Sequence, residues 1–216
     1  MDDRALNDLR SLAAQDAQLA AAAARLRELD SEASEVRAAA EAVDRFFAVY
    51  PAEDTARRET VREAEAELAR RGDELREAES RLAEARDDDA RAHAQHAIDR
   101  AHDHIAVAEA GFARARASYD ELEHEAAELP ARVPVLEARA AAVAAEVPDV
   151  PAPGEGPRAL VDWASHAHAE LFVAAGQIDT ERERTIREAN ELASMLTGEP
   201  TYGSTAAQAL ARAERY

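Results

Sequence analysis

The apolar residues of this chain recur with the alternating three- and four-residue spacing of helices that pack along one stripe. In the N-terminal part the stripe consists of Leu12, Leu19, Leu26, Leu29, Ala33, Val36, Ala40, Val43, Phe47 and Tyr50. A stripe of this length needs a facing surface to cover it. The pattern therefore predicts a long helix over residues 3–49 that pairs with another helix.

Residues 54–129 contain no proline and carry two further apolar series. The first series is Val61, Ala64, Leu68, Leu75, Ala78, Leu82 and Ala85, and the second is Ala94, Ile98, Ala101, Ile105, Ala108, Phe112, Ala115, Tyr119, Leu122 and Leu129. On a continuous helix these two series are out of phase. We interpret the stretch as one very long helix that changes its packing partner between the two series.

A second interpretation places a turn at Asp87–Asp89. It would fold residues 3–49, 51–86 and 90–129 into a three-helix bundle. Aspartate is a good residue for capping the start of a helix, but no glycine or proline marks a turn at this point. We therefore favour the continuous helix and keep the bundle as the alternative.

Prolines supply the expected boundaries of the long helix. Pro51 lies between the first two stripes, and the residue before a proline is disfavoured in helical geometry, so a turn is expected at residues 50–54. A short link of this kind predicts an antiparallel hairpin. Pro130 and Pro134 are expected to end the long helix.

The last third of the chain is expected to be helical again. Residues 158–197 are framed by Gly156-Pro157 and Gly198, and a short helix is expected over residues 205–215. The stripe of the longer helix is Leu171, Ala175, Ile178, Thr185, Ala189, Leu192 and Leu196. We expect it to pack on the second series, Ile98–Leu129.

Together these patterns predict an all-α fold. The expected architecture is an elongated antiparallel helical hairpin or coiled coil, built on one very long central helix with a C-terminal long helix packing back on it. The expected domains are a coiled-coil hairpin over residues 1–129, a short helix and proline-rich linker over 130–157, and the C-terminal helices over 158–216.

Composition and charge narrow the function classes. The 216 residues include only 4% aromatics, seven glycines and eight prolines, which is typical of long helices with thin alanine-rich seams and not of an α/β enzyme. A net charge of −19 repels phosphate backbones, so no nucleic acid partner is expected. The chain has no lysine and no cysteine, which excludes a P-loop lysine, a Schiff-base lysine and a thiol nucleophile.

The sequence also bears on location. No apolar stretch approaches the roughly 20 residues that cross a bilayer, so no transmembrane segment is expected. The N-terminus lacks the basic start and apolar core of a secretory signal. We therefore expect a cytoplasmic protein.

The most site-like group of polar residues contains His93, His96, Asp99 and Asp103, spaced three or four apart. Imidazole and carboxylate groups at this spacing can chelate a divalent metal ion. A single helix rarely supplies a complete site, however, and no second cluster of similar density exists. We therefore expect a solvated face with neither metal nor cofactor, and a His/carboxylate metal-binding helical protein is kept as an alternative.

Glu121-x-x-His124 matches half of the pattern found in carboxylate-bridged di-iron proteins. That pattern requires a second Glu-x-x-His on another helix. His166 and His168 do not have this spacing. Among 45 acidic residues and seven histidines, one match is expected by chance.

These observations favour a non-catalytic structural or scaffolding coiled-coil protein. It would act through self-association or through binding of a protein partner by coiled-coil surfaces. Phe46, Phe47 and Tyr50, at the expected hairpin tip, are the predicted partner-binding residues. The alternative from another class is a membrane-surface coiled-coil remodelling protein, although the chain lacks a basic amphipathic N-terminal helix.

Overall fold

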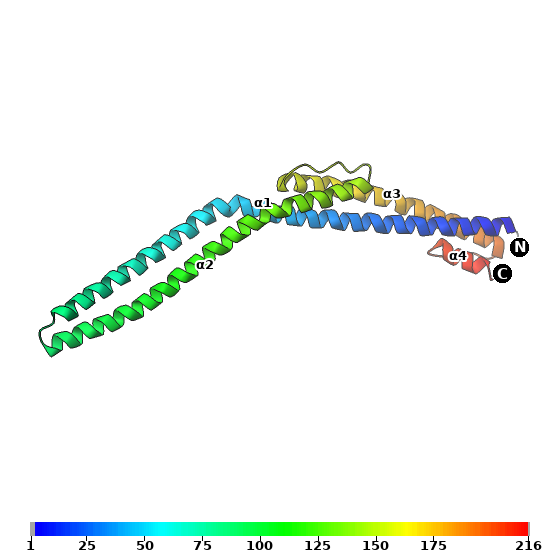
Figure 1. Cartoon of the computed structure of the whole chain (residues 1–216). Helices are drawn as coiled ribbons and strands as arrows, with labels where there is room; N and C mark the ends of the chain where they lie inside the picture. The colour runs from blue at the N-terminus through cyan, green and yellow to red at the C-terminus, as the bar shows by residue number, and fades with distance from the viewer. Residues whose placement is uncertain (1–2, 216) are drawn as a thin grey trace. The chain divides into compact units, whose positions relative to one another are not determined.

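The computed structural model describes residues 3–215, and over this range the chain is all-α (Figure 1). Its elements are α1 (Asp3–Glu84), α2 (Asp88–Glu146), α3 (Pro157–Thr197) and α4 (Ala206–Ala213), and the described residues contain no strand. The predicted fold class is thus confirmed at the level of all-α. Two compact units divide the chain: unit 1 contains the described residues up to Ala42 and from Val133 onward, and unit 2 is Val43–Arg132.

The turn expected at residues 50–54 is wrong, because α1 continues through Pro51. A proline has no N–H and leaves the carbonyl four residues earlier without its helical donor. Here that carbonyl belongs to Phe47, and both residues are exposed, so water can satisfy it. The Thr55 hydroxyl also donates to the Pro51 carbonyl at 2.8 Å, which keeps this turn of the helix closed.

The chain reverses instead between Glu84 and Asp88, so the single very long helix over residues 54–129 is also wrong. The second interpretation placed a turn close to this point. The turn contains neither glycine nor proline. Asp87 follows it, and its Oδ1 accepts from the Ala90 amide at 2.7 Å, which caps the start of α2. The phase change between the two apolar series therefore marks a reversal of the chain.

Unit 2 pairs residues 43–84 of α1 with residues 88–132 of α2 in antiparallel orientation (Figure 1). Arg57 donates to the Ser118 carbonyl at 2.7 Å, as expected for two helices joined near residue 86. Both apolar series face inward, and their buried members are Ala78, Ala94, Ile98, Ala101, Ala108, Tyr119, Leu122 and Leu129. The two series are out of phase because they lie on different helices.

Tyr119 is the main polar anchor of this pair. The guanidinium groups of Arg58 and Arg116 lie over its ring, 5.6 and 5.7 Å from the ring centre. Its hydroxyl accepts from Arg58 Nε at 2.9 Å and donates to Glu123 at 2.7 Å. The hydrogen bond to the Glu123 carboxylate raises the pKa of Tyr119. Since Arg58 comes from α1 and Tyr119 from α2, these contacts help to fix the register of the two helices.

Pro130 and Pro134 were expected to end the long helix, and this is wrong as well. α2 runs through both prolines to Glu146. Both are exposed, and the helix loses one backbone hydrogen bond at each of them on a solvent-facing side. Beyond Pro134, α2 belongs to unit 1.

The main core of unit 1 forms where α1, α2 and α3 meet. Its buried members are Leu29, Ala33, Val36, Ala40, Leu136, Ala140, Val143, Val147, Val150, Leu160, Trp163, Ala164, Ala167 and Leu171. Within each helix these residues keep the three- and four-residue spacing of a packing stripe. The proline-rich segment after α2 also packs here, since Trp163 Nε1 donates to the Pro151 carbonyl at 2.8 Å.

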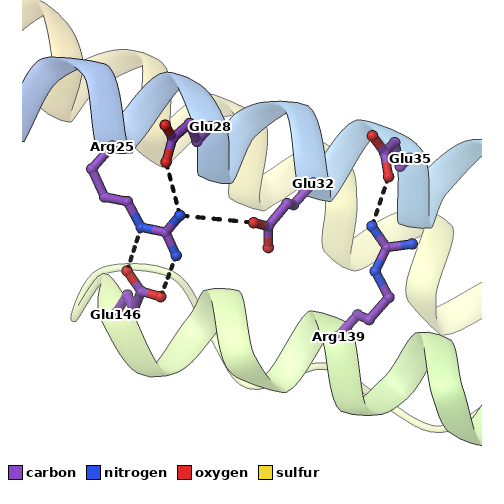
Figure 2. A network of polar contacts seen from close by, with 6 residues as sticks. All are labelled: Arg25, Glu28, Glu32, Glu35, Arg139 and Glu146. Atoms are coloured by element: carbon purple, nitrogen blue, oxygen red, sulfur yellow. Dashed lines mark hydrogen bonds and ion pairs between the residues drawn. The ribbon is translucent and has the colours of Figure 1, made fainter.

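Charged contacts join α1 and α2 beside this core (Figure 2). Arg25 binds both carboxylate oxygens of Glu146, at 2.9 and 2.6 Å, and also reaches Glu28 at 3.0 Å. Arg139 pairs with Glu35 at 2.7 Å. Glu146 is the last residue of α2, where the helix dipole disfavours negative charge, and Arg25 offsets this cost. The same contact lowers the pKa of Glu146 and raises the pKa of Arg25.

α3 was expected to pack on residues 98–129, and this expectation is wrong. Its buried face packs on the N-terminal half of α1 and on the end of α2. A second cluster of unit 1 joins α1, α3 and α4 through Leu6, Leu9, Ala189, Ala193, Ala206, Ala209 and Ala213. The predicted stripe of α3 contains buried residues but omits the buried face before Leu171, which includes Leu160 and Trp163. A periodic pattern on one helix also does not identify the helix that covers it.

The buried carboxylate of Asp16 connects the same three helices. Its Oδ1 accepts from Arg182 Nε on α3 at 2.8 Å, and its Oδ2 accepts from the Ala206 amide at the start of α4 at 2.9 Å. The exposed fraction of Asp16 is only 4%. Since α4 contributes mainly alanines to the cluster, this carboxylate adds a buried polar contact at the start of α4.

Replacing Asp16 by alanine is expected to lower the free energy of unfolding by about 2 kcal/mol, because a buried amide and a partly buried guanidinium lose their shared acceptor. Urea denaturation followed by circular dichroism measures the change. Asp8, exposed on the same helix, supplies the matched control D8A, which should change stability by less than about 0.5 kcal/mol. Equal effects of the two substitutions would contradict the role assigned to Asp16.

Candidate functional site

Unit 1 contains an open groove of about 980 Å³ between the C-terminal half of α3 and the segment that leads to α4. Its lining residues are Glu183, Ile186, Arg187, Asn190, Glu191, Ser194, Met195, Gly198, Glu199, Pro200, Thr201 and Tyr202. The α3 residues in this set recur every three or four positions, so they form one face of the helix. The groove therefore has α3 as its floor and residues 198–202 as its wall.

The wall begins where α3 ends. Gly198 has φ +68°, a left-handed conformation that suits glycine, and its amide donates to the Ser194 carbonyl. Thr201 then returns along the helix, and its amide donates to Ser194 Oγ at 2.8 Å. Ser194 Oγ in turn donates to the Asn190 carbonyl at 2.7 Å. The wall is thus tied to the helix that forms the floor.

Asn190 makes the second tie. Its side-chain amide donates to the Gly203 carbonyl at 2.9 Å and accepts from the Gly203 amide at 2.7 Å. Both backbone groups of one loop residue are thereby satisfied by one side chain. This pair of bonds fixes the distance between the wall and α3, so the groove is preformed.

Gly203 is required for this close approach. A Cβ atom added there would lie 2.9 Å from the Thr205 carbonyl oxygen, 3.2 Å from the Ala209 amide and 3.2 Å from Asn190 Oδ1. Two of these neighbours are backbone atoms and cannot rotate away. A side chain at this position would push the wall from α3 or displace α4.

Large apolar side chains stand at the mouth of the groove. Met195 is 74% exposed and Tyr202 is 88% exposed, one from the floor and one from the wall. Methionine adapts its shape to a partner, and tyrosine is enriched among the residues that dominate binding. Their exposure on a strongly charged chain is typical of a contact surface.

The wall also contains a buried hydroxyl that lacks a hydrogen-bond partner in the described part of the chain, Oγ1 of Thr201. An unsatisfied buried hydroxyl is unfavourable, and such groups are rare in folded proteins. Departures of this kind tend to occur where a segment has a function besides folding.

The charge of the groove is acidic. Glu183, Glu191 and Glu199 line it together with a single arginine, Arg187. Glu199 pairs with Arg212 of α4 at 3.0 Å. Between residues 3 and 215, no ion pair is formed by Glu183 or Glu191, so their charge is directed to solvent.

The predicted partner-binding residues Phe46, Phe47 and Tyr50 lie in the middle of α1, in unit 2, and not at a hairpin tip. The ring of Phe46 contacts both others, with centres 5.4 Å from Phe47 and 5.6 Å from Tyr50. Phe47 is 39% exposed and the neighbouring Val49 is 56% exposed. We call these four residues the aromatic patch.

The candidate metal ligands His93, His96, Asp99 and Asp103 are all exposed, on the side of α2 opposite to its buried stripe. His93 Nδ1 is hydrogen-bonded to the Asp89 carbonyl at 3.0 Å, and the Asp99 carboxylate accepts a hydrogen bond from the Gln95 side chain at 3.1 Å. Nowhere in residues 3–215 do three or more His, Asp or Glu side chains gather in a way that could hold a metal ion.

The half di-iron motif has a local explanation. His124 Nε2 lies 3.2 Å from Glu128 Oε1, one turn further along α2. His168 pairs with Asp30 of α1 at 2.7 Å. Each of these two histidines thus has a carboxylate partner within its own compact unit.

Sequence reasoning missed the groove. The spacing of the α3 stripe identified its buried face, but Met195 lies off that stripe and Tyr202 lies beyond the helix. The available signal was two large apolar residues on either side of Gly198 and Pro200, outside any packing stripe. Such residues have no position in the predicted core and are candidates for an exposed contact surface.

No model of a known protein family matches the chain, and no curated protein and no solved structure shows significant similarity to it. Its functional assignment therefore depends on its own residues. Within the described range, no helix combines the length and the apolar character needed to cross a membrane.

Replacing Gly203 by alanine is expected to destabilise the protein by about 1–3 kcal/mol, because the new methyl group overlaps fixed backbone atoms. Gly176 in α3 is the matched control, since a Cβ there meets nothing within 4 Å. G176A should instead stabilise the protein by about 0.5–1 kcal/mol through its better helix propensity. Thermal unfolding of both variants measures the two changes in stability, which are expected to have opposite signs. Stabilisation by G203A would show that the wall does not approach α3 closely.

Proposed function

We propose that this protein is a non-catalytic scaffolding protein that binds partner proteins through surfaces presented by paired coiled-coil helices. The groove of unit 1 is the observation that carries this proposal. Its wall is held by Asn190 and Ser194, and its mouth presents Met195 and Tyr202 to solvent. A preformed surface of this kind loses little conformational entropy on binding.

The polar groups of the groove support a binding role over a catalytic one. The side chains of Asn190 and Ser194 are used in tying the wall to α3. The Ser194 hydroxyl is hydrogen-bonded to the Asn190 carbonyl and the Thr201 amide, and neither of these is a base that could activate a nucleophile. The remaining charged groups stand at the exposed rim.

A scaffold needs at least two places at which other proteins attach. The aromatic patch in unit 2 is the second surface in this proposal, with Phe47 and Val49 exposed beside the half-buried rings of Phe46 and Tyr50. Aromatic residues that are already packed against one another lose little freedom when a partner covers them. The groove and the patch lie in different compact units, so we propose that each takes a separate partner.

Photo-crosslinking tests the proposal. A benzophenone amino acid replaces Tyr202 at the mouth of the groove, and in a control replaces Phe172, a 73% exposed aromatic residue on α3 outside the groove. We expect the Tyr202 position to give a discrete crosslinked product with a protein partner in cells of the native host, and the Phe172 position to give none. Identical product patterns at both positions, or no product at either, would count against the groove as a binding surface.

A further inference from the structure

We propose that the groove binds one basic amphipathic helix of a partner protein. The apolar face of that helix would lie between Met195 and Tyr202, and its lysine or arginine residues would lie near Glu183 and Glu191. This inference rests on the proposed function and adds the chemistry of the partner segment. It follows from the length of the groove, the exposure of its lining and its excess of acidic side chains.

The floor of the groove has the length of a short helix. From Glu183 to Met195 it follows α3 for just over three turns, or about 18 Å at 1.5 Å per residue. A partner helix of about three turns presents apolar anchors at positions i, i+3 or i+4, and i+7, as in other helix-in-groove complexes. Ile186 in the floor and Tyr202 in the wall provide apolar contacts on both sides of such a helix.

The exposure of the lining favours a protein segment over a small molecule. Most lining residues, including Arg187 and Pro200, are exposed, and only Thr201 is buried. Small-molecule sites cover most of the surface of their ligand. A helix needs only one of its faces covered, and this groove can cover one face.

The charge of the groove and of the chain indicates the charge that a partner segment should carry. Glu183 and Glu191 lie two turns apart on α3 with Arg187 between them, and Glu199 adds a third carboxylate at the wall. The 216 residues have a net charge of −19, so a second copy would approach against like charge. A segment rich in lysine or arginine is attracted by both the local and the overall charge, and this complementarity also raises its association rate.

Glu183 and Glu191 lie about two turns apart on α3, and this spacing adds a geometric requirement for the partner helix. Residues eight apart on a helix lie on the same face, about 12 Å apart along the axis. A partner helix that lies along α3 can meet both carboxylates with basic residues that are likewise about two turns apart on the rim of its apolar face. The groove should therefore distinguish an amphipathic arrangement from a mere excess of positive charge.

Defined peptides test this inference with the full-length protein. The probe is an 18-residue Leu/Lys peptide with an amphipathic helical pattern. Its comparisons are the same pattern with glutamate in place of lysine, and a scrambled Leu/Lys peptide without an apolar face. Fluorescence anisotropy measures binding at low and at high salt. We expect the amphipathic Leu/Lys peptide to bind at least about tenfold more tightly than either comparison, with weaker binding at high salt.

Matched variants locate the binding. E183Q/E191Q should weaken binding of the Leu/Lys peptide by about tenfold, since two charge pairs are lost. M195S/Y202S should weaken it by more than about tenfold, because apolar anchors dominate such interfaces. The controls D162N/E170Q and F172S remove two carboxylates or one exposed aromatic group from α3 outside the groove and should leave the affinity unchanged. Circular dichroism confirms that each variant is folded.

Several outcomes would overturn the inference. Equal binding of the scrambled peptide would mean that only net charge is recognised, and equal effects of the control variants would place the binding elsewhere. A dimer in analytical ultracentrifugation that is lost in M195S/Y202S would identify a second copy as the occupant. If Tyr202 crosslinks to a partner but the Leu/Lys peptide does not bind, the scaffolding function stands and the basic helix is rejected.

Discussion

The small side chains at the contacts between helices limit how strongly apolar packing can hold the helices of this protein in place. Alanines recur among the buried residues of both units, as at Ala78 and Ala101 in unit 2 and at Ala40, Ala140 and Ala189 in unit 1. Alanines let helix backbones approach closely, but each buries little apolar area, and hydrophobic stabilisation scales with that area. Such a contact holds two helices together but specifies their register along one another only weakly.

Polar contacts between the helices specify this register. In unit 2, Arg58 of α1 reaches the Tyr119 hydroxyl of α2. In unit 1, Arg25 binds Glu146, and Asp16 joins Arg182 to the start of α4. The groove follows the same principle, because its wall is tied to α3 by the side chains of Asn190 and Ser194. The functional surface is therefore built by the same type of interaction that fixes the fold.

The sequence predicted the helices and their buried faces better than their ends and partners. Heptad spacing identified the inward faces of α1, α2 and α3 because burial repeats with the helical period. Pro51, Pro130 and Pro134 were misinterpreted as ends because the cost of a proline depends on whether the freed carbonyl reaches water, which is a property of the fold. The reversal at Asp87 depends on one capping side chain, and the groove depends on contacts of Asn190 with a residue thirteen positions later. Phe46, Phe47 and Tyr50 were chosen because they lay at the expected hairpin tip. That tip is wrong, and the role of these residues as a partner surface stays a prediction.

Hydrogen exchange at the wall of the groove tests most directly whether polar anchors position the segments of this protein. The amides of Thr201 and Gly203 donate to the side chains of Ser194 and Asn190, so both should exchange much more slowly than amides of an unstructured chain. In N190A the protection of Gly203 should be lost, while amides in the buried half of α3 keep theirs. Rapid exchange of Gly203 in the unmodified protein, or unchanged protection in N190A, would contradict the account.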